Sequence, residues 1–249
     1  MFPETLSMTI TSSQNEKLKT LRKLRQRRRE RDRLGQFVAE GEDLLAAADA
    51  AGWVAVERFA ASDSGLPGIE VDAAALKSVT DLASGTRTLA IYNERWLALN
   101  QIPPSGPVVY LHGVSDPGNV GTVLRSAAAF GASCVALGPG SADPFSPKAV
   151  RASMGAIFEV PVTRAAAEQL PGTTIALDAG AERTLAEVAA ELPADAPVSL
   201  LLGAEREGLP AELIAAASTA ARIPIATESL NAAIAASVAL YELSKRSST

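Results

Sequence analysis

The sequence contains few cysteine, histidine and aromatic residues. Among its 249 residues there is one cysteine, Cys134, and one histidine, His112. A single cysteine cannot form an intrachain disulfide, and one residue of each type cannot build a zinc cluster, so disulfide scaffolds and Cys/His metal enzymes are excluded and no metal is predicted. Only two Trp, three Tyr and six Phe are present. This scarcity argues against a surface that reads RNA by stacking bases on aromatic side chains.

Long apolar runs are also absent. No run reaches the roughly 18 residues that a membrane span needs, and the first five residues lack the basic-then-apolar pattern of a secretory signal, which predicts a cytoplasmic protein without a membrane partner. The chain is 47% hydrophobic and 20% charged, a balance typical of globular proteins. Its length suffices for one large core or two modest ones.

The net charge of −5 hides a strong local division. Residues 16–33 hold ten basic and three acidic side chains, whereas the chain from Leu34 onward holds thirteen basic and twenty-four acidic ones. Leu18, Leu21 and Leu24 recur at helical spacing inside the basic stretch, which predicts an amphipathic helix with one basic face. Such a helix attracts polyanions through phosphate contacts. We therefore expect this helix to contact RNA through Lys17, Lys19, Arg22, Arg25 and Arg28. Arg151 is a further candidate for a phosphate contact.

The hydropathy pattern predicts two α/β domains. Residues 1–99 are expected to form a small domain with the basic helix, short strands near residues 36–41, 53–59, 69–71 and 89–92, and helices at 42–51 and 73–82. Residues 100–107 are rich in proline and polar residues and are predicted to be a linker. In residues 108–249, strand patterns at 108–112, 134–137, 174–178, 198–202 and 221–225 alternate with helical patterns at 120–130, 148–154, 185–190, 211–217 and 230–245. This alternation predicts a mostly parallel sheet covered by helices.

Three loops after predicted strands concentrate Gly, Asn, Glu and Ser, at 112–121, 203–210 and 224–231. In parallel sheets the ligand sits beyond the carboxyl ends of the strands, so these loops are the candidate site. None fits the G-x-G-x-x-G fingerprint or the Lys-Ser/Thr phosphate loop, which disfavours a nicotinamide or ATP enzyme.

Taken in order, these loops resemble the signature of the SpoU (TrmH-type) RNA ribose 2′-O-methyltransferases of the knotted SPOUT superfamily. The matching segments are Asp116–Gly121 with Arg125 and Gly131, Val150–Phe158, Leu202–Gly208, and Ile223–Pro224 with Ser229–Asn231. The first domain resembles the ribosomal-protein-like substrate-binding domain of the same enzymes at Ser12, Asn15, Lys19, Phe37, Glu40 and Gly41.

The resemblance implies a fold and a set of roles. It implies a deep trefoil knot formed by the C-terminal segment, a homodimer, and S-adenosylmethionine as the methyl donor. The cofactor is then held around Leu202, Gly203, Gly208, Ile223 and Leu230, and the catalytic residues are Asn119, Arg125, Glu205, Ser229 and Asn231. The resemblance also implies that some of these catalytic residues come from the partner protomer.

Arg125 is expected to face the same cleft as Asn119. A guanidinium with a pKa above about 12 is a poor base, so we expect Arg125 to stabilise the developing alkoxide. His112 is the only imidazole, but it precedes the motif and is not expected to be the base. Cys134 is expected to be a packing residue.

The third motif departs from the family pattern. Ile225 stands where the family has Met, and the loop before Ser229 is about two residues short and contains no Gly. This departure keeps open the alternative of a non-catalytic RNA-binding or ribosome-assembly factor. The resemblance as a whole implies methylation of a ribose in structured RNA, with 23S ribosomal RNA as the first candidate substrate and tRNA as the second.

Overall fold

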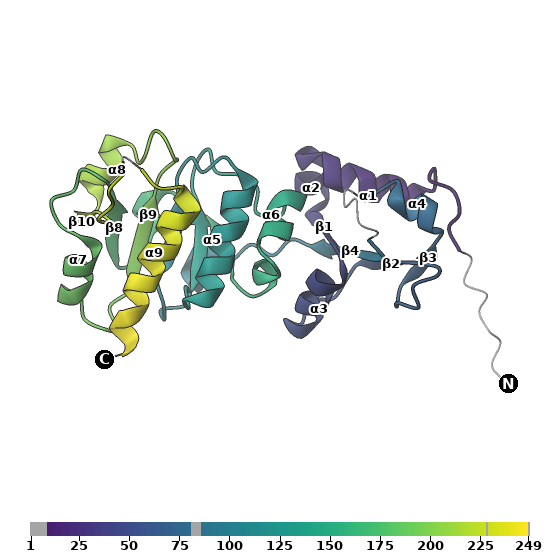
Figure 1. Cartoon of the computed structure of the whole chain (residues 1–249), viewed down its shortest axis with the longest axis horizontal. Coiled ribbons are helices and arrows are strands. Elements are labelled where there is room, and N and C mark those ends of the chain that lie inside the picture. Colours follow the sequence, from purple (N-terminus) through teal and green to yellow (C-terminus); the bar gives the residue numbers. More distant parts are fainter. Residues whose placement is uncertain (1–8, 81–85, 228, 249) are drawn as a thin grey trace. The chain divides into compact units, whose positions relative to one another are not determined.

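The computed structural model describes residues 9–80, 86–227 and 229–248. It divides into two compact units (Figure 1). Unit 1 comprises the chain up to Glu94 together with Phe145–Arg151, and unit 2 comprises Arg95–Pro144 and the chain from Ala152 onward. The chain thus passes between the units before the expected linker at 100–107. It returns to unit 1 at 145–151, an excursion that the sequence pattern does not predict.

Unit 1 contains a four-stranded sheet. The order is β1-β4-β2-β3, with β1 and β2 antiparallel to β4 and with β3 parallel to β2. Alternate residues of β1 serve opposite faces of the sheet. Val38 packs in the core cluster that includes Leu21, whereas Phe37 packs with Trp53 and Phe145 at ring distances of 6.0 and 4.9 Å. The strands are Gln36–Glu40 (β1), Glu57–Ala61 (β2), Ile69–Val71 (β3) and Thr88–Asn93 (β4).

The helices of unit 1 include the basic segment. Asn15 caps α1 by accepting the amide of Lys17 at 2.9 Å, and the three leucines at helical spacing are fully buried as predicted. The single helix expected there is broken at Arg27, whose backbone is extended at φ −127° and ψ 110°. The helices are Glu16–Gln26 (α1), Arg28–Leu34 (α2), Glu42–Ala50 (α3) and Ala73–Lys77 (α4). The expected end of the last one, Leu82, lies outside the described residues.

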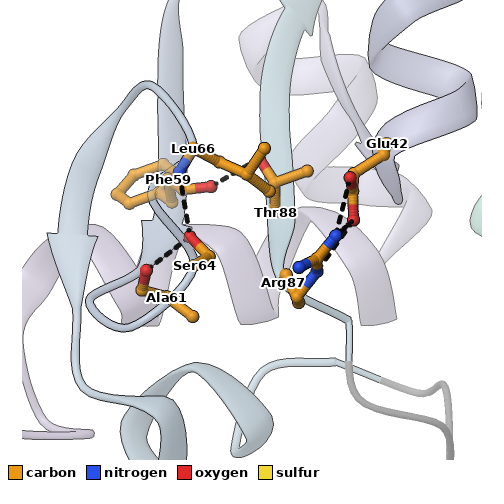
Figure 2. Close-up of polar contacts among 7 residues, drawn as sticks. All are labelled: Glu42, Phe59, Ala61, Ser64, Leu66, Arg87 and Thr88. Carbon is orange, nitrogen blue, oxygen red and sulfur yellow. Dashed lines mark hydrogen bonds and ion pairs between the residues drawn. The ribbon is translucent and has the colours of Figure 1, made fainter.

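Side-chain hydrogen bonds tie α3 and the β2–β3 turn to the sheet (Figure 2). The hydroxyl of Thr88 on β4 donates to the carbonyl of Phe59 on β2 at 2.8 Å. Arg87 forms a bidentate pair with Glu42 in the first turn of α3, at 2.7–2.9 Å. The hydroxyl of Ser64 donates to the carbonyl of Ala61 at 2.6 Å and thereby stabilises the turn after β2.

Unit 2 is built on a six-stranded, fully parallel sheet of order β10-β8-β9-β5-β6-β7, which confirms the predicted fold class. The pattern did not predict β7. It also placed β10 too late, because Arg222 pairs only as an isolated bridge to Thr184 and Pro224 has no amide to donate. The strands are Val108–Leu111 (β5), Cys134–Leu137 (β6), Val162–Arg164 (β7), Thr173–Leu177 (β8), Val198–Leu202 (β9) and Thr219–Ala221 (β10).

The helices of unit 2 cover both faces of this sheet. α9 packs against α5 and α7 (Figure 1), and α8 belongs to the apolar cluster on the face of Val108 and Tyr110. No helix among the described residues is long and apolar enough to cross a membrane. The α-helices that begin beyond the linker are Pro117–Ala129 (α5), Pro147–Ala152 (α6, mostly in unit 1), Leu185–Glu191 (α7), Ala211–Ala216 (α8) and Ala232–Ser244 (α9). Short 3-10 turns occupy Leu99–Gln101, Ala156–Phe158, Ala167–Gln169 and Lys245–Ser248.

Candidate active site

The carboxyl ends of β8, β9 and β10 open into a pocket within unit 2. It holds about 660 Å³ of empty space, its mouth included. All five residues that the family resemblance assigns to the cofactor line this pocket, namely Leu202, Gly203, Gly208, Ile223 and Leu230. The lining also includes Leu177, Asp178 and Ala179, which sequence reasoning missed. Their position directly at the end of a predicted strand was the available signal, because every such end in a parallel sheet reaches the ligand edge.

The chemistry of the lining fits S-adenosylmethionine. Most of the lining side chains are apolar, and the charged ones in the described part of the chain are the carboxylates of Asp178 and Glu205. Carboxylates repel a phosphate-bearing nucleotide but attract a cofactor that carries a sulfonium and an ammonium group. The pocket is therefore suited to the methyl donor that the motifs predict.

Gly203 is required by the loop that closes this pocket. A Cβ atom on Gly203 would lie 2.0 Å from the carbonyl carbon of Gly208, so any other residue would force the loop apart. The loop closes through the Gly208 amide, which donates to the Ala204 carbonyl at 2.9 Å. Gly208 itself adopts a positive φ of 67°, which glycine tolerates best. Both glycines of the second motif thus shape the backbone that carries Glu205.

Three of the predicted catalytic residues meet beside the pocket. The amide nitrogen of Asn119 donates to Oε1 of Glu205 at 2.6 Å. The amide nitrogen of Asn231 donates to the same Glu205 oxygen and to Oδ1 of Asn119, the latter at 3.2 Å. These residues are 86 and 26 positions apart from Glu205 in sequence. Their three motifs therefore converge on one carboxylate, which we call the amide–carboxylate cluster (Asn119, Glu205 and Asn231).

Helix caps hold this cluster in place. Asn231 is the N-cap of α9, since its Oδ1 accepts the amides of Ala233 and Ile234 at 3.0 and 3.3 Å. The N-cap of α5 is Asp116, and Asn119 lies in the first turn of that helix. Two helix N-termini thus surround Glu205, and their partial positive charges favour a carboxylate there. The side chains of Asn119 and Asn231 are positioned by helix geometry and leave little freedom to Glu205.

Arg125 and Ser229 are not part of this cluster. Ser229 is exposed and lines the pocket. Arg125 lies six residues beyond Asn119 on α5, which rotates it by roughly 120° around the helix axis at about 100° per residue. It is exposed and is not among the residues that line the pocket, so its predicted place in the cleft of Asn119 stays a prediction.

His112 and Cys134 have structural surroundings. Nδ1 of His112 lies 3.3 Å from the hydroxyl of Tyr110, two residues back on β5 and facing the apolar cluster that α8 covers. Burial is the main cause that raises the pKa of Tyr110. Burial likewise raises the pKa of the Cys134 thiol to about 12, and this side chain is fully buried in β6. Among the described residues, no group of three His, Cys, Asp or Glu could hold a metal ion.

Arg25 in unit 1 does not lie on the predicted RNA-binding face. Its side chain is only 5% exposed and forms an ion pair with Glu40 at 2.7 Å. It also donates to the carbonyl of Val79. Arg31 is buried too and donates to the carbonyl of Leu24 at 2.7 Å. These two arginines point into the unit because they tie α1 and α2 together and to β1.

The other residues predicted to contact RNA differ in their exposure and in their ion pairs. Lys17 pairs with Glu57, Lys19 with Glu16 at 2.8 Å, and Arg28 lies 3.6 Å from Asp32. Arg22 is half-buried and donates to the carbonyl of Ser13 at 3.4 Å, while Arg151 is exposed on α6. Basic residues that are exposed on the same segment, and that the prediction did not single out, are Lys23, Arg27, Arg29 and Arg33, of which Arg33 pairs with Glu30 at 3.0 Å.

Comparison with solved structures defines the class of protein. An rRNA methyltransferase from Sinorhizobium meliloti, solved with bound AdoMet, is 32% identical, with a TM-score of 0.84 over 95% of this chain and 97% of its own. An RNA 2′-O ribose methyltransferase is 30% identical, with a TM-score of 0.78 over 97% and 99%. The fold thus places the chain in the class of S-adenosylmethionine-dependent RNA 2′-O-methyltransferases.

Comparison of sequences gives the family. The model of the SpoU rRNA Methylase family matches residues 106–241, and that of the MRM3-like substrate binding domain matches residues 15–90. The 23S rRNA (guanosine(2553)-2′-O)-methyltransferase RlmP of Bacillus subtilis is 28% identical over 94% of this chain and 98% of its own length. The chain belongs to the SpoU rRNA methylase family.

Proposed function

We propose that this protein methylates the 2′-oxygen of one ribose in 23S ribosomal RNA, in the cytoplasm. The observation that carries the proposal is the amide–carboxylate cluster beside a pocket suited to S-adenosylmethionine. The activity of the Bacillus subtilis relative, which matches nearly the whole chain, supports 23S ribosomal RNA as the substrate. The non-catalytic alternative has no comparable support, because the shortened third motif still lines the pocket and still caps α9.

The residues of the site have different roles in the reaction. S-adenosylmethionine supplies an already activated methyl group, so the protein has to align the ribose oxygen with it and assist loss of the hydroxyl proton. Glu205 fixes the two amide side chains of the cluster, and these orient the ribose together with Ser229. Arg125 stabilises the developing alkoxide through its guanidinium donors, and the proton leaves to phosphate or water. The backbone around Gly203, Ile223 and Leu230 holds the adenosine part.

We further propose that the protein is a homodimer in which Arg125 serves the pocket of the partner. Two observations support this arrangement: Arg125 turns away from its own cluster, and α9 carries an exposed apolar stripe. Ile234, Val238 and Tyr241 of that stripe are 52%, 40% and 53% exposed, at helical spacing. A contiguous apolar stripe on a folded domain is typical of a surface that another chain covers.

Two parts of the proposal rest on membership of the family. The C-terminal segment is threaded as a deep trefoil knot, and Gly203, Gly208, Ile223 and Leu230, which come from two separate loops, line one pocket. Residues 1–99 form the RNA-binding domain and residues 108–249 the methyltransferase domain. The basic face of α1 and α2, together with Arg151, contacts RNA phosphates.

The test is the pattern of ribose methylation in 23S ribosomal RNA. We expect RNA from cells that lack this protein to lose methylation at one nucleotide, and the purified protein to restore it on unmodified 23S transcript with S-adenosylmethionine. A Glu205→Gln variant is the matched control for a folded but impaired enzyme. An unchanged methylation pattern together with no transfer in vitro would overturn the proposal.

A further inference from the structure

Asp178 places a negative charge in a pocket whose lining is mostly apolar. It lines the pocket directly after β8, and its side chain is partly buried. The other carboxylate of the lining, that of Glu205, already accepts the amides of Asn119 and Asn231. Among the residues that the structure describes, none forms a hydrogen bond or an ion pair with the Asp178 carboxylate. A partly buried carboxylate of this kind favours a ligand that brings hydrogen-bond donors.

The backbone on both sides of Asp178 is fixed. Its amide donates to the carbonyl of Ala221 on β10 at 3.0 Å, and its carbonyl accepts the amide of Ala181 at 3.2 Å. The guanidinium of Arg222 donates to the carbonyls of Ala181 and Glu182, at 3.4 and 3.0 Å. The loop after β8 is thus tied to the end of β10. This restricts the directions that the carboxylate can take, and it lowers the entropy lost when a ligand binds.

Gly180 leaves room for this carboxylate. A Cβ atom on Gly180 would lie 3.2 Å from Oδ2 of Asp178, which is closer than ordinary van der Waals contact. The φ angle of Gly180 is outside the left-handed region, so its conformation does not require glycine. The missing side chain is therefore explained by the space that the carboxylate needs.

The order of the strands places Asp178 beside the adenosine part of the cofactor. β8 lies between β9 and β10, so its loop lies between the loops that carry Gly203 and Ile223, the residues that hold adenosine in the proposed function. The ring nitrogens of adenine are acceptors, whereas the ribose presents two neighbouring hydroxyl donors. A carboxylate only accepts hydrogen bonds, and its two oxygens match two adjacent donors. Dinucleotide-binding folds also hold a ribose hydroxyl with an acidic residue.

We propose that the carboxylate of Asp178 accepts hydrogen bonds from the 2′- and 3′-hydroxyls of the ribose of S-adenosylmethionine, and that it makes the pocket selective for a ribonucleoside. The proposal rests on the cofactor pocket of the proposed function and not on the identity of the RNA substrate. Asp178 binds the cofactor and takes no part in the transfer of the methyl group.

The test compares adenosine, 2′-deoxyadenosine and 3′-deoxyadenosine as ligands of the wild-type protein and of an Asp178→Ala variant, in titrations followed by NMR. We expect the wild-type protein to prefer adenosine to either deoxynucleoside by about tenfold, the value of one lost hydrogen bond to a charged group. The variant should bind all three with the same affinity. In calorimetry it should bind S-adenosylmethionine, and also 5′-methylthioadenosine, which lacks the amino-acid part, roughly tenfold to 100-fold more weakly than the wild type does.

Glu182→Ala is the matched control. Glu182 is exposed on the same loop and is not among the residues that line the pocket. The control removes the same charge, so it should change neither affinity nor the preference for adenosine. Gly180→Ala keeps the carboxylate but crowds it, and should lose part of the preference. Should the Asp178→Ala variant fail to fold, Asp178→Asn keeps the shape of the side chain and should show a smaller loss of the same preference.

Three results would overturn the ribose contact. The first is a wild-type protein that binds the three nucleosides equally. The second is an Asp178→Ala variant with unchanged affinity for every ligand. The third is a variant that binds S-adenosylmethionine more weakly but still prefers adenosine to both deoxynucleosides, which would assign the carboxylate to the sulfonium or the ammonium group. Failure of the wild-type protein to methylate any 23S transcript would instead overturn the proposed function, and the preference for adenosine would still be measurable.

Discussion

At the scale of single residues, Asn231 performs two tasks that substitution can separate. Its oxygen caps α9 and its nitrogen binds Glu205. Serine caps a helix as well as asparagine does but offers no amide. We expect Asn231→Ser to keep the melting temperature within a few degrees, and to lower the methylation rate by about tenfold to 100-fold, the value of a lost hydrogen bond to a charged group. Single-turnover methylation and thermal unfolding measure the two effects.

Asn231→Ala is the companion to this variant. It loses the cap as well, so it should show the same loss of rate and, in addition, about 1 kcal/mol of lost stability. A wild-type rate for the serine variant would mean that the amide–carboxylate cluster is structural only.

Arg25 illustrates the opposite case, a basic residue whose role is stability. Its ion pair with Glu40 is largely buried, and removal of Arg25 takes away the cation that balances this carboxylate while the hydrogen bond from the Thr86 hydroxyl at 2.6 Å stays. We expect Arg25→Met to destabilise unit 1 by about 3–5 kcal/mol in denaturant unfolding. The double variant Arg25→Met/Glu40→Gln should recover most of that stability, because no buried charge is left. If the single variant unfolds like the wild type, the pair contributes nothing to stability.

At the scale of elements, the basic face of α1 and α2 is defined by what the structure leaves exposed. Lys23, Arg27, Arg29 and Arg33 are exposed, but Arg33 pairs with Glu30 at 3.0 Å, and the partly buried Lys19 pairs with Glu16 at 2.8 Å. We expect the triple variant Lys23→Gln/Arg27→Gln/Arg29→Gln to weaken 23S RNA binding and to reduce its salt slope by roughly two to three, and to leave S-adenosylmethionine binding unchanged. Filter binding and calorimetry measure these two quantities.

A matched control for the triple variant is Arg58→Gln, which removes a basic residue of unit 1 that pairs with Asp49 at 2.5 Å outside the basic segment. It should leave the salt slope unchanged. An unchanged slope for the triple variant would place the RNA contacts elsewhere on the protein.

The elements also show which kinds of information the sequence carries. Alternating strand and helix patterns predicted the parallel sheet and most of its strands, because buried parallel strands read as short apolar runs. The strand β7 escaped notice, since Val162–Arg164 is only three residues long and ends in an exposed arginine. The break between α1 and α2 escaped as well, because seven of the eight residues Arg27–Leu34 are charged and give no apolar period to interrupt.

At the scale of the whole molecule, the motifs predicted which residues lie close together better than they predicted the direction of each side chain. Asn119, Glu205 and Asn231 were predicted from motifs far apart in the chain, and they meet because the first turn of α5, the loop after β9 and the N-terminus of α9 converge. The direction of Arg125 follows from helical periodicity, and the inward direction of Arg25 does not, since Glu40 becomes its partner only when β1 packs against α1. The return of 145–151 to unit 1 depends on Phe145 packing against Phe37, a contact between residues more than a hundred positions apart.

The proposed dimer makes a prediction that only a two-chain molecule can satisfy. If Arg125 serves the partner's pocket, a heterodimer of one Asn119→Ala chain and one Arg125→Ala chain contains one intact site, composed of Asn119 from one protomer and Arg125 from the other. We expect both homodimers of these variants to be inactive. The heterodimer, co-expressed with two different tags and purified through both, should show about half of the wild-type activity, because an isologous dimer has two equivalent sites.

The control is the same pair of substitutions on one chain, co-expressed with the unaltered chain, which leaves no intact trans site: the wild-type pocket lacks the partner's Arg125, and the other pocket lacks Asn119. That heterodimer should be inactive if Arg125 acts across the interface, and half active if it acts within its own chain. The two heterodimers therefore give opposite results under the two arrangements. Light scattering of the wild-type protein tests the premise, and a monomer at the concentrations of the assay would contradict the proposed site as a whole.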